Sequence, residues 1–214
     1  MQFGVSEAVA HWGLYRKEAI ALVCDGVKLN YGELNCRVDF LAADLSRAFP
    51  SINRVGLLVS RKPDFLISLI AILRCAKSAV LLNQFLTTDD LRASGEDASL
   101  EAVIVDSASQ EGSSYHEGFL SELQCFQIPR TWPTQPRTIS TAQFPTAAPT
   151  DEWGVFYSSG TTGIPKGIVR DHYSVVTEIL GWCFELGLSS RTYFYIGRPL
   201  FYTGGLLFAL SELS

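Results

Sequence analysis

The chain has 214 residues, of which 47% are hydrophobic and 18% are charged. An average globular protein has about 25% charged residues, and disordered chains combine low hydrophobicity with high net charge, so this composition excludes intrinsic disorder. The 17 Lys and Arg and the 22 Asp and Glu give a net charge of -5, which supplies no basic surface for nucleic acid. A chain of this length has room for one sizeable domain or two small ones.

Targeting and redox signals are weak. The first residues have neither the basic cluster nor the apolar run of a secretory signal, which favours a cytoplasmic protein. The most apolar stretch, residues 65–82, is interrupted by Arg74 and Lys77, so we expect no membrane span. The cysteines are widely spaced and include no Cys-x-x-Cys pair. We therefore expect reduced core residues at Cys24, Cys36, Cys75, Cys125 and Cys183.

The chain begins with a predicted hairpin and helix. Asp25-Gly26 is a strong tight-turn signal between two β-rich runs, residues 19–24 and 27–30. Asn30 followed by Glu33 resembles a helix cap, and helical spacing of apolar residues follows. The apolar positions are Leu34, Val38, Leu41 and Leu45, and the positions expected to face solvent are Arg37, Asp44 and Arg47.

Strands and helices then alternate as far as residue 128. Residues 55–59, 79–82 and 103–105 are predicted strands. Helices are predicted from Pro63-Asp64 to Leu73 and from Thr87/Thr88 onward. This order predicts an α/β fold with a mostly parallel sheet and helices on both faces.

A change in composition divides the chain. Residues 129–150 contain five of the nine prolines and six threonines, which predicts a surface connection without regular structure. We expect an α/β subdomain over residues 1–128. Residues 151–214 would hold a phosphate-loop segment and the start of a second, incomplete subdomain.

The most informative segment is a loop rich in glycine and hydroxyl residues between two strand-like runs, residues 153–157 and 168–169. It reads Ser158-Ser-Gly-Thr-Thr-Gly-Ile-Pro-Lys-Gly167. Glycines let successive N–H groups converge on one anion, hydroxyls add donors, and Lys166 adds a positive charge. This combination indicates polyphosphate binding.

Two common phosphate-binding motifs do not match. The Walker loop requires Gly-Lys-Ser/Thr, whereas Pro165 precedes the lysine here and Gly167 follows it. The dinucleotide fingerprint G-x-G-x-x-G is also missing. A flexible hairpin loop is the simplest alternative, but it does not explain the lysine placed between proline and glycine directly after an apolar strand.

The run from Tyr157 to Gly167 resembles the signature loop of the adenylate-forming (AMP-binding) superfamily, which includes acyl-CoA synthetases, peptide-synthetase adenylation domains and luciferases. Residues 29–34, Leu-Asn-Tyr-Gly-Glu-Leu, resemble an early segment of that family. Residues 198–205, Arg-Pro-Leu-Phe-Tyr-Thr-Gly-Gly, resemble its Pro-Leu-Phe-His-x-x-Gly segment, with Tyr202 at the histidine position.

The resemblance implies activation of a carboxylic acid with Mg-ATP to an acyl-adenylate. The acyl group would then pass to coenzyme A or to the phosphopantetheine thiol of an acyl carrier protein. Lys166 would neutralise the pyrophosphate leaving group and is the expected catalytic residue, while the metal ligands stay unassigned. The residues expected to bind the phosphates are Ser158, Ser159, Gly160, Thr161, Thr162, Gly163 and Lys166.

Tyr202 is the expected substrate residue, at the carboxylate end of the acyl pocket. Peptide-synthetase domains for α-amino acids usually place an aspartate here, because a carboxylate pairs with the substrate ammonium. Tyrosine cannot do this, so we expect an aryl or aliphatic acid without an α-amino group. A purely structural role for Tyr202 as an aromatic wall is an equal alternative. His172 is expected to be a first-turn residue of a helix rather than a base.

Members of the resembled family are much longer, so the 214 residues are expected to be an N-terminal portion that is inactive alone. The alternative is a shortened, non-catalytic homologue that acts as a nucleotide-binding or interaction module. The stretch from Asp171 onward has few charges, which predicts exposed apolar surface and self-association.

Overall fold

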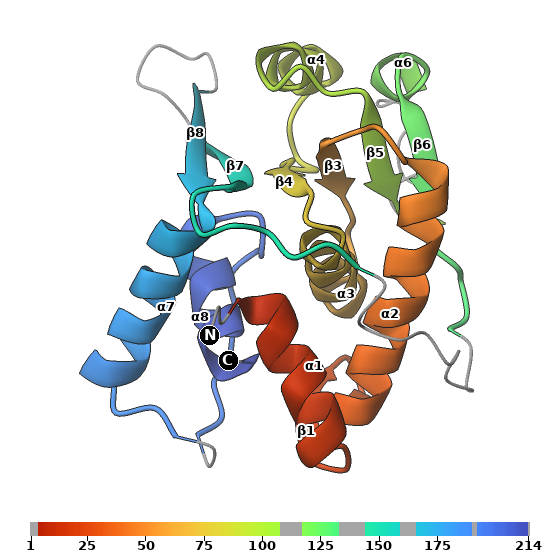
Figure 1. Ribbon diagram of the computed structural model, residues 1–214. Coiled ribbons are helices and arrows are strands. Elements are labelled where there is room, and N and C mark those ends of the chain that lie inside the picture. Colours follow the sequence, from red (N-terminus) through yellow and green to blue (C-terminus); the bar gives the residue numbers. More distant parts are fainter. Residues whose placement is uncertain (1–3, 108–116, 133–143, 159–165, 190–191, 214) are drawn as a thin grey trace.

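The computed structural model describes residues 4–107, 117–132, 144–158, 166–189 and 192–213. A six-stranded sheet lies at its centre, with strand order β6-β5-β3-β4-β7-β8 (Figure 1). All neighbouring strands are parallel except β7 and β8, which are antiparallel. The strands are β3 (Arg54–Leu58), β4 (Ser78–Leu81), β5 (Ala102–Val105), β6 (Gln124–Gln127), β7 (Glu152–Ser158) and β8 (Lys166–Asp171).

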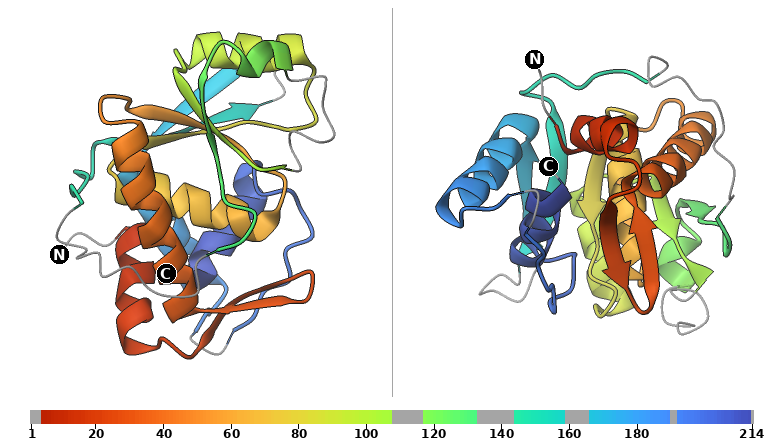
Figure 2. Two further views of the ribbon diagram at one scale, coloured as in Figure 1. Left: turned by 90° about the vertical axis from the view of Figure 1, so that its right-hand side faces the viewer. Right: turned by 90° about the horizontal axis from the view of Figure 1, so that it is seen from below.

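Helices cover both faces of this sheet, as predicted (Figure 2). One face packs on α4 and α6, and the other on the remaining helices. The helices are α1 (Val5–Tyr15), α2 (Tyr31–Ala48), α3 (Lys62–Arg74), α4 (Thr88–Asp97), α6 (Glu117–Leu120), α7 (His172–Glu185) and α8 (Thr203–Leu213). The α/β fold with a mostly parallel sheet is confirmed.

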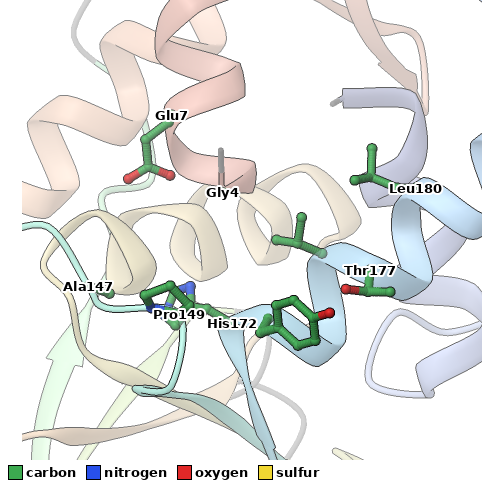
Figure 3. A pocket seen from close by; sticks show the side chains of 9 residues that line it. Gly4, Glu7, Ala147, Pro149, His172, Thr177 and Leu180 are labelled. Carbon is green, nitrogen blue, oxygen red and sulfur yellow. The ribbon is translucent and has the colours of Figure 1, made fainter. Parts of the chain in front are cut away.

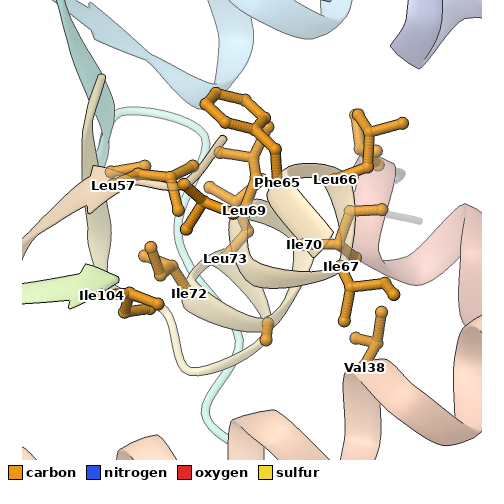
Figure 4. Packing of buried hydrophobic residues seen from close by; sticks show 14 of the residues in the cluster. Val38, Leu57, Phe65, Leu66, Ile67, Leu69, Ile70, Ile72, Leu73 and Ile104 are labelled. Carbon is orange, nitrogen blue, oxygen red and sulfur yellow. The ribbon is translucent and has the colours of Figure 1, made fainter. Parts of the chain in front are cut away.

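Alternation along the central strands produces the two apolar layers. On β3, Leu57 packs with α2 and α3, whereas its neighbour Leu58 packs with Leu91 of α4 and Phe119 of α6. Successive residues of a strand point to opposite faces, so a strand covered on both sides is apolar throughout. Figure 4 shows the side chains of α3 between Leu57 and Ile104 of the sheet and Val38 of α2.

The predicted hairpin and the helix that follows are confirmed. Strands β1 (Ile20–Cys24) and β2 (Val27–Asn30) pair antiparallel through a turn in which Asp25 and Gly26 both have positive φ, 50° and 78°. Asn30 caps α2: its side chain accepts from the Glu33 N–H at 2.7 Å, and the Glu33 carboxylate accepts from the Asn30 N–H at 3.0 Å. This reciprocal cap fixes the first turn of the helix.

The two charges that interrupt the most apolar stretch are buried. Lys77 donates to the backbone carbonyls of Phe49 at 2.8 Å and Ile52 at 2.6 Å, which ties the end of α2 to the start of β4. Arg74 forms a buried ion pair with Asp39 of α2. Within the described residues, no helix is long and apolar enough to cross a membrane.

Two expectations about individual side chains were wrong. Arg37 is half-buried over the Trp132 ring, at 5.8 Å from its centroid, because the connection after β6 returns across α2. Only Cys75 among the cysteines is a buried core residue, and Cys125 is exposed. Cysteine type alone does not specify burial, since the other four lie on partly covered helices and strands.

The residues of the 129–150 connection that the structure describes, 129–132 and 144–150, form no helix or strand. Strand β7, which follows the connection, pairs with β4 over Ala79↔Gly154 to Leu81↔Phe156. The approach is close: a Cβ on Gly154 would lie 2.5 Å from the Ala79 carbonyl oxygen. The segment after the connection thus extends the sheet built by the first part of the chain.

Candidate functional site

The start of β7 is fixed by an arginine. Two nitrogens of the Arg54 guanidinium, Nε and Nη2, donate to the Glu152 carboxylate, each at 2.7 Å. The third, Nη1, donates to the Ala98 carbonyl at 2.9 Å. Ser78 donates to the same carboxylate at 2.5 Å. These hydrogen bonds hold the pKa of Glu152 below its ordinary value. The strand that leads to the loop therefore starts from a rigid point shared by β3, β4 and α4.

Replacing Glu152 with glutamine tests whether the hydrogen bonds of its carboxylate stabilise the fold, because their contribution depends on pH. Because the folded-state pKa of Glu152 is depressed, its contribution to stability is present above the unfolded pKa and lost as pH falls through the folded value. We expect the variant to lose about 2 kcal/mol at neutral pH, and we expect this deficit to shrink as pH falls below the ordinary glutamate pKa of about 4.3. Urea unfolding at several pH values measures this. Glu122→Gln, which removes the carboxylate of the exposed ion pair with Arg92, is the control. A stability deficit of Glu152→Gln that does not depend on pH, or that is no larger than the deficit of the control, would contradict this role of Glu152.

The predicted phosphate loop connects β7 to β8. The last pair of this antiparallel ladder is Ser158↔Lys166, preceded by Tyr157↔Gly167. The intervening candidates Ser159, Gly160, Thr161, Thr162 and Gly163 lie outside the described residues. The side chain of Lys166 is exposed at the strand end. The structure therefore brings the backbone of the two ends of the predicted loop together, at Ser158 and Lys166.

Tyr157, next to the loop, is tied to the C-terminal turn of α4. Its hydroxyl lies 2.6 Å from the Ser94 carbonyl oxygen and 3.0 Å from Asp97 Oδ2. Burial, together with the neighbouring Asp97 carboxylate, raises the pKa of Tyr157 well above its ordinary value, so the phenol stays protonated. Sequence reasoning quoted Tyr157 within the motif but assigned it no role, because its partners lie about 60 residues earlier.

The loop starts at the edge of the sheet where the parallel strands end. At this edge the buried Asp106, just after β5, accepts hydrogen bonds from the backbone N–H groups of Ser60 at 2.9 Å and Arg61 at 3.0 Å. The turn after β3 is thereby held against the end of β5. In open α/β sheets, ligands bind outside the carboxyl ends of the strands, which is where the loop begins.

Tyr202 lies just before α8. Its side chain is half exposed, and its ring contacts that of Phe201, which in turn contacts Phe85 after β4. Phe85 and Phe201 line a cavity of about 150 Å³ beside the turn after β3. A larger groove of about 370 Å³ lies between residues 194–198 and the first turns of α8. Tyr202 lines neither, and no described contact joins it to Lys166.

His172 is the first residue of α7, as expected, and lines a separate cavity of about 240 Å³ with Glu7 and Pro149 (Figure 3). Burial lowers its pKa, and its Nε2 atom is buried without a partner among the described residues. No described contact links it to the loop. Within the ranges that the structure describes, no three His, Cys, Asp or Glu side chains converge as metal ligands.

The family model described as AMP-binding enzyme matches residues 9–211. The chain belongs to this family. Its relatives include adenylation modules of peptide synthetases and acyl-CoA ligases, so the adenylate-forming assignment made from residues 157–167 is confirmed.

Two curated relatives illustrate this range. Malpinin synthetase of Mortierella alpina is 32% identical over 162 residues, which cover 74% of this chain and 2% of the relative. The 2-succinylbenzoate–CoA ligase of Bacillus velezensis is 25% identical over 194 residues, covering 88% of this chain and 38% of the ligase. The chain therefore spans less than half the length of either relative.

Solved structures agree on the fold. A putative long-chain-fatty-acid CoA ligase from Rhodopseudomonas palustris superposes with a TM-score of 0.82 at 16% identity, covering 99% of this chain and 55% of that chain. A nonribosomal peptide synthetase, FmoA3, bound to α-methyl-L-serine-AMP superposes with a TM-score of 0.81 at 17% identity and covers 99% of this chain. The described segments thus adopt the fold of the N-terminal part of AMP-binding enzymes.

Proposed function

We propose that this chain supplies the phosphate-binding part of an enzyme that activates a carboxylic acid with Mg-ATP and transfers the acyl group to coenzyme A or to a carrier-protein thiol. The observation that supports it most is the loop from Ser158 to Lys166, whose ends pair between β7 and β8 in a chain of the AMP-binding family. The donor chemistry suits polyphosphate: a cationic side chain is exposed at one end of a sequence rich in hydroxyls and glycine.

In this proposal the residues of the chain bind the phosphates of ATP and neutralise their negative charge. Lys166 lies next to the phosphates and neutralises the pyrophosphate that leaves when the acyl carboxylate attacks the α-phosphorus. Backbone N–H groups and hydroxyls of Ser158, Ser159, Gly160, Thr161, Thr162 and Gly163 donate to phosphate oxygens. Mg²⁺ would enter with ATP and supply further charge neutralisation, with Ser158 as a candidate hydroxyl near it.

The acid is proposed to carry no α-amino group. Tyr202, at the segment 198–205, offers no negative charge to pair with an ammonium group. The groove beside α8 has an aromatic lining with a guanidinium, which suits an apolar acid better than a zwitterion: its residues include Phe194, Arg198 and Phe208. The named relatives include both peptide synthetases and a ligase for 2-succinylbenzoate, so the test must compare the two substrate classes.

Trapping with hydroxylamine tests the activity and the acid class together. Hydroxylamine converts an acyl-adenylate to a hydroxamate, so product reports activation without a thiol acceptor. The longest polypeptide that carries this chain is incubated with Mg-ATP and matched acids, such as 3-phenylpropanoate against phenylalanine. We expect hydroxamate only from acids without the α-amino group. Product from the amino acids alone would contradict the acid class, and no product from any acid would count against activation.

The 214 residues alone are proposed to lack turnover, because they cover only 55% of the solved CoA ligase chain that shares their fold. Pyrophosphate exchange by this polypeptide at the rate of its longer relatives would contradict the proposal. The second candidate is a non-catalytic nucleotide-binding module, favoured by the same loop. It predicts Mg-ATP binding without acid activation in any longer version of the chain.

Self-association and a cytoplasmic location complete the proposal. Large apolar side chains of α7 and residues 193–195 are exposed, among them Phe184 at 86% and Tyr195 at 94%. Exposed apolar patches of this kind favour association. A constant monomer mass in sedimentation velocity over a wide concentration range would contradict self-association of this chain.

A further inference from the structure

The C-terminal turn of α4, residues 94–98, is linked to both ends of β7, to its start through Arg54 of β3 and to its end directly through Tyr157. At the start of β7, the Ala98 carbonyl accepts from Arg54, which also holds Glu152. At the other end, the Tyr157 hydroxyl reaches the Ser94 carbonyl and the Asp97 carboxylate. Tyr157 directly precedes the predicted phosphate loop, so one helix end fixes the strand that enters it.

We propose that Tyr157 and Asp97 are positioning residues for nucleotide binding: their hydrogen bond to each other, on the C-terminal turn of α4, sets where the two ends of the phosphate loop lie. The proposal rests on the proposed function, since it concerns the loop assigned to ATP. It concerns Tyr157 and Gly167, the paired strand residues next to the loop ends at Ser158 and Lys166.

The C-terminal turn of α4 is closed by backbone hydrogen bonds and packs on the sheet through Ala98. Ser99 follows the helix with φ of 50°, and the Leu100 N–H donates to the Gly95 carbonyl at 2.8 Å, which closes the helix end. Ser94 is buried. A tyrosine held by this turn is therefore held relative to the whole sheet.

Asp97 is the last residue of α4, where the negative end of the helix dipole disfavours a carboxylate. The C-terminus of a helix carries a partial negative charge, so an anion in the last turn needs a nearby donor or cation. The Tyr157 hydroxyl supplies the donor, and Arg54 lies close enough to interact electrostatically with Asp97. Because the phenol has one proton, Asp97 and the Ser94 carbonyl compete for it.

The second end of the loop meets the same carboxylate. A Cβ on Gly167 would lie 2.7 Å from Asp97 Oδ2, 3.0 Å from a methyl of Val155 and 3.4 Å from the Tyr157 ring. A side chain at position 167 would therefore require the Asp97 carboxylate to move. Asp97 thus contacts the strand on each side of the loop, which a contact needed only for the stability of β7 would not require.

Deleting one hydroxyl at each end of β7, one on the strand itself and one on its neighbour β4, separates positioning from stability. Tyr157→Phe removes the hydroxyl beside the loop and keeps the ring. Ser78→Ala removes the hydroxyl that donates to Glu152 at the far end of β7 and serves as the matched control. Asp97→Ala removes one of the two acceptors of the Tyr157 hydroxyl and leaves the Ser94 carbonyl. Each chain is compared with wild type by amide hydrogen exchange of residues 154–170 without ligand and by calorimetric titration of Mg-ATP.

We expect Tyr157→Phe and Asp97→Ala to weaken Mg-ATP binding about fivefold, the factor of one ordinary hydrogen bond, and to accelerate exchange at Tyr157 and Gly167. Ser78→Ala should lower stability by a similar amount without either change. Unchanged exchange at the loop ends, or Mg-ATP affinity that falls equally in Ser78→Ala, would overturn the inference. A wild-type chain and a Lys166→Ala chain that bind Mg-ATP equally weakly would instead contradict the proposed function, while exchange still reports on the contact with α4.

Discussion

Replacing Lys166 with alanine is expected to lower the rate of acid-dependent adenylation by about 100- to 1,000-fold in the longest polypeptide that carries this chain. Lys166 is exposed at the start of β8, opposite Ser158, so its ammonium group is available to a ligand rather than committed to the fold. Removing one charge aimed at a leaving group costs most in the transition state, where the negative charge develops.

Unfolding measurements distinguish this loss from damage to the structure. An exposed lysine contributes little to folding, so Lys166→Ala should unfold within about 0.5 kcal/mol of wild type. Lys28→Ala, at another exposed lysine on a β-strand, is the matched control and should leave the rate unchanged. A rate within about threefold of wild type for Lys166→Ala would contradict the assigned role.

Replacing Arg74 with methionine is expected to destabilise the fold by about 3 to 5 kcal/mol. Arg74 ends α3 and is only 4% exposed at its side chain. It donates to Asn35 Oδ1 at 2.7 Å and to the backbone carbonyl of Ser6 at 2.7 Å, and it pairs with Asp39. Three helices, α1, α2 and α3, therefore depend on one guanidinium, and its removal leaves a buried carboxylate without a cation.

The pH dependence of unfolding tests whether the unpaired Asp39 carboxylate causes the destabilisation of Arg74→Met. Burial raises the pKa of Asp39 even though Arg74 opposes the shift. A raised folded-state pKa means that the folded chain binds the proton more readily, so stability falls as pH rises through that value. Without Arg74 the pKa rises further, so the deficit of Arg74→Met should be smaller at about pH 5 than at pH 7, measured by urea unfolding.

Two further variants test whether the loss of stability comes from the buried pair of Arg74 and Asp39. Adding Asp39→Asn to Arg74→Met should recover part of the lost stability, since the unpaired charge is gone. Arg92→Met, which removes an exposed pair with Asp89, should cost less than about 1 kcal/mol. A cost for Arg74→Met no greater than that for Arg92→Met would contradict the account of the buried pair.

Local signals predicted the elements well because their causes are local. The cap formed by Asn30 and Glu33 and the Asp25-Gly26 turn depend on residues no more than three positions apart, and the structure contains both. The same holds for the alternation that places Leu57 on one face of the sheet. The family assignment also came from one continuous run of residues, which required no knowledge of tertiary contacts.

Long-range contacts account for what sequence reasoning missed. In the sequence, Arg74 indicated only an interruption of an apolar stretch, because its partner Asp39 lies 35 residues earlier. Tyr157 received no role for the same reason, since Asp97 is 60 residues away. Arg37 was assigned to solvent because the spacing of a helix says nothing about a loop that returns across it.

The central claim is that the loop between Ser158 and Lys166 serves ATP-dependent activation of a carboxylic acid. Exchange of labelled pyrophosphate into ATP tests it most directly, because the exchange requires reversible formation of an acyl-adenylate. The assay uses the longest polypeptide that carries this chain, a panel of aryl, aliphatic and amino acids, and Lys166→Ala as the matched variant. We predict exchange that depends on one class of acid and is lost in the variant. Exchange that is absent with every acid, or that is equal in wild type and Lys166→Ala, would contradict the claim.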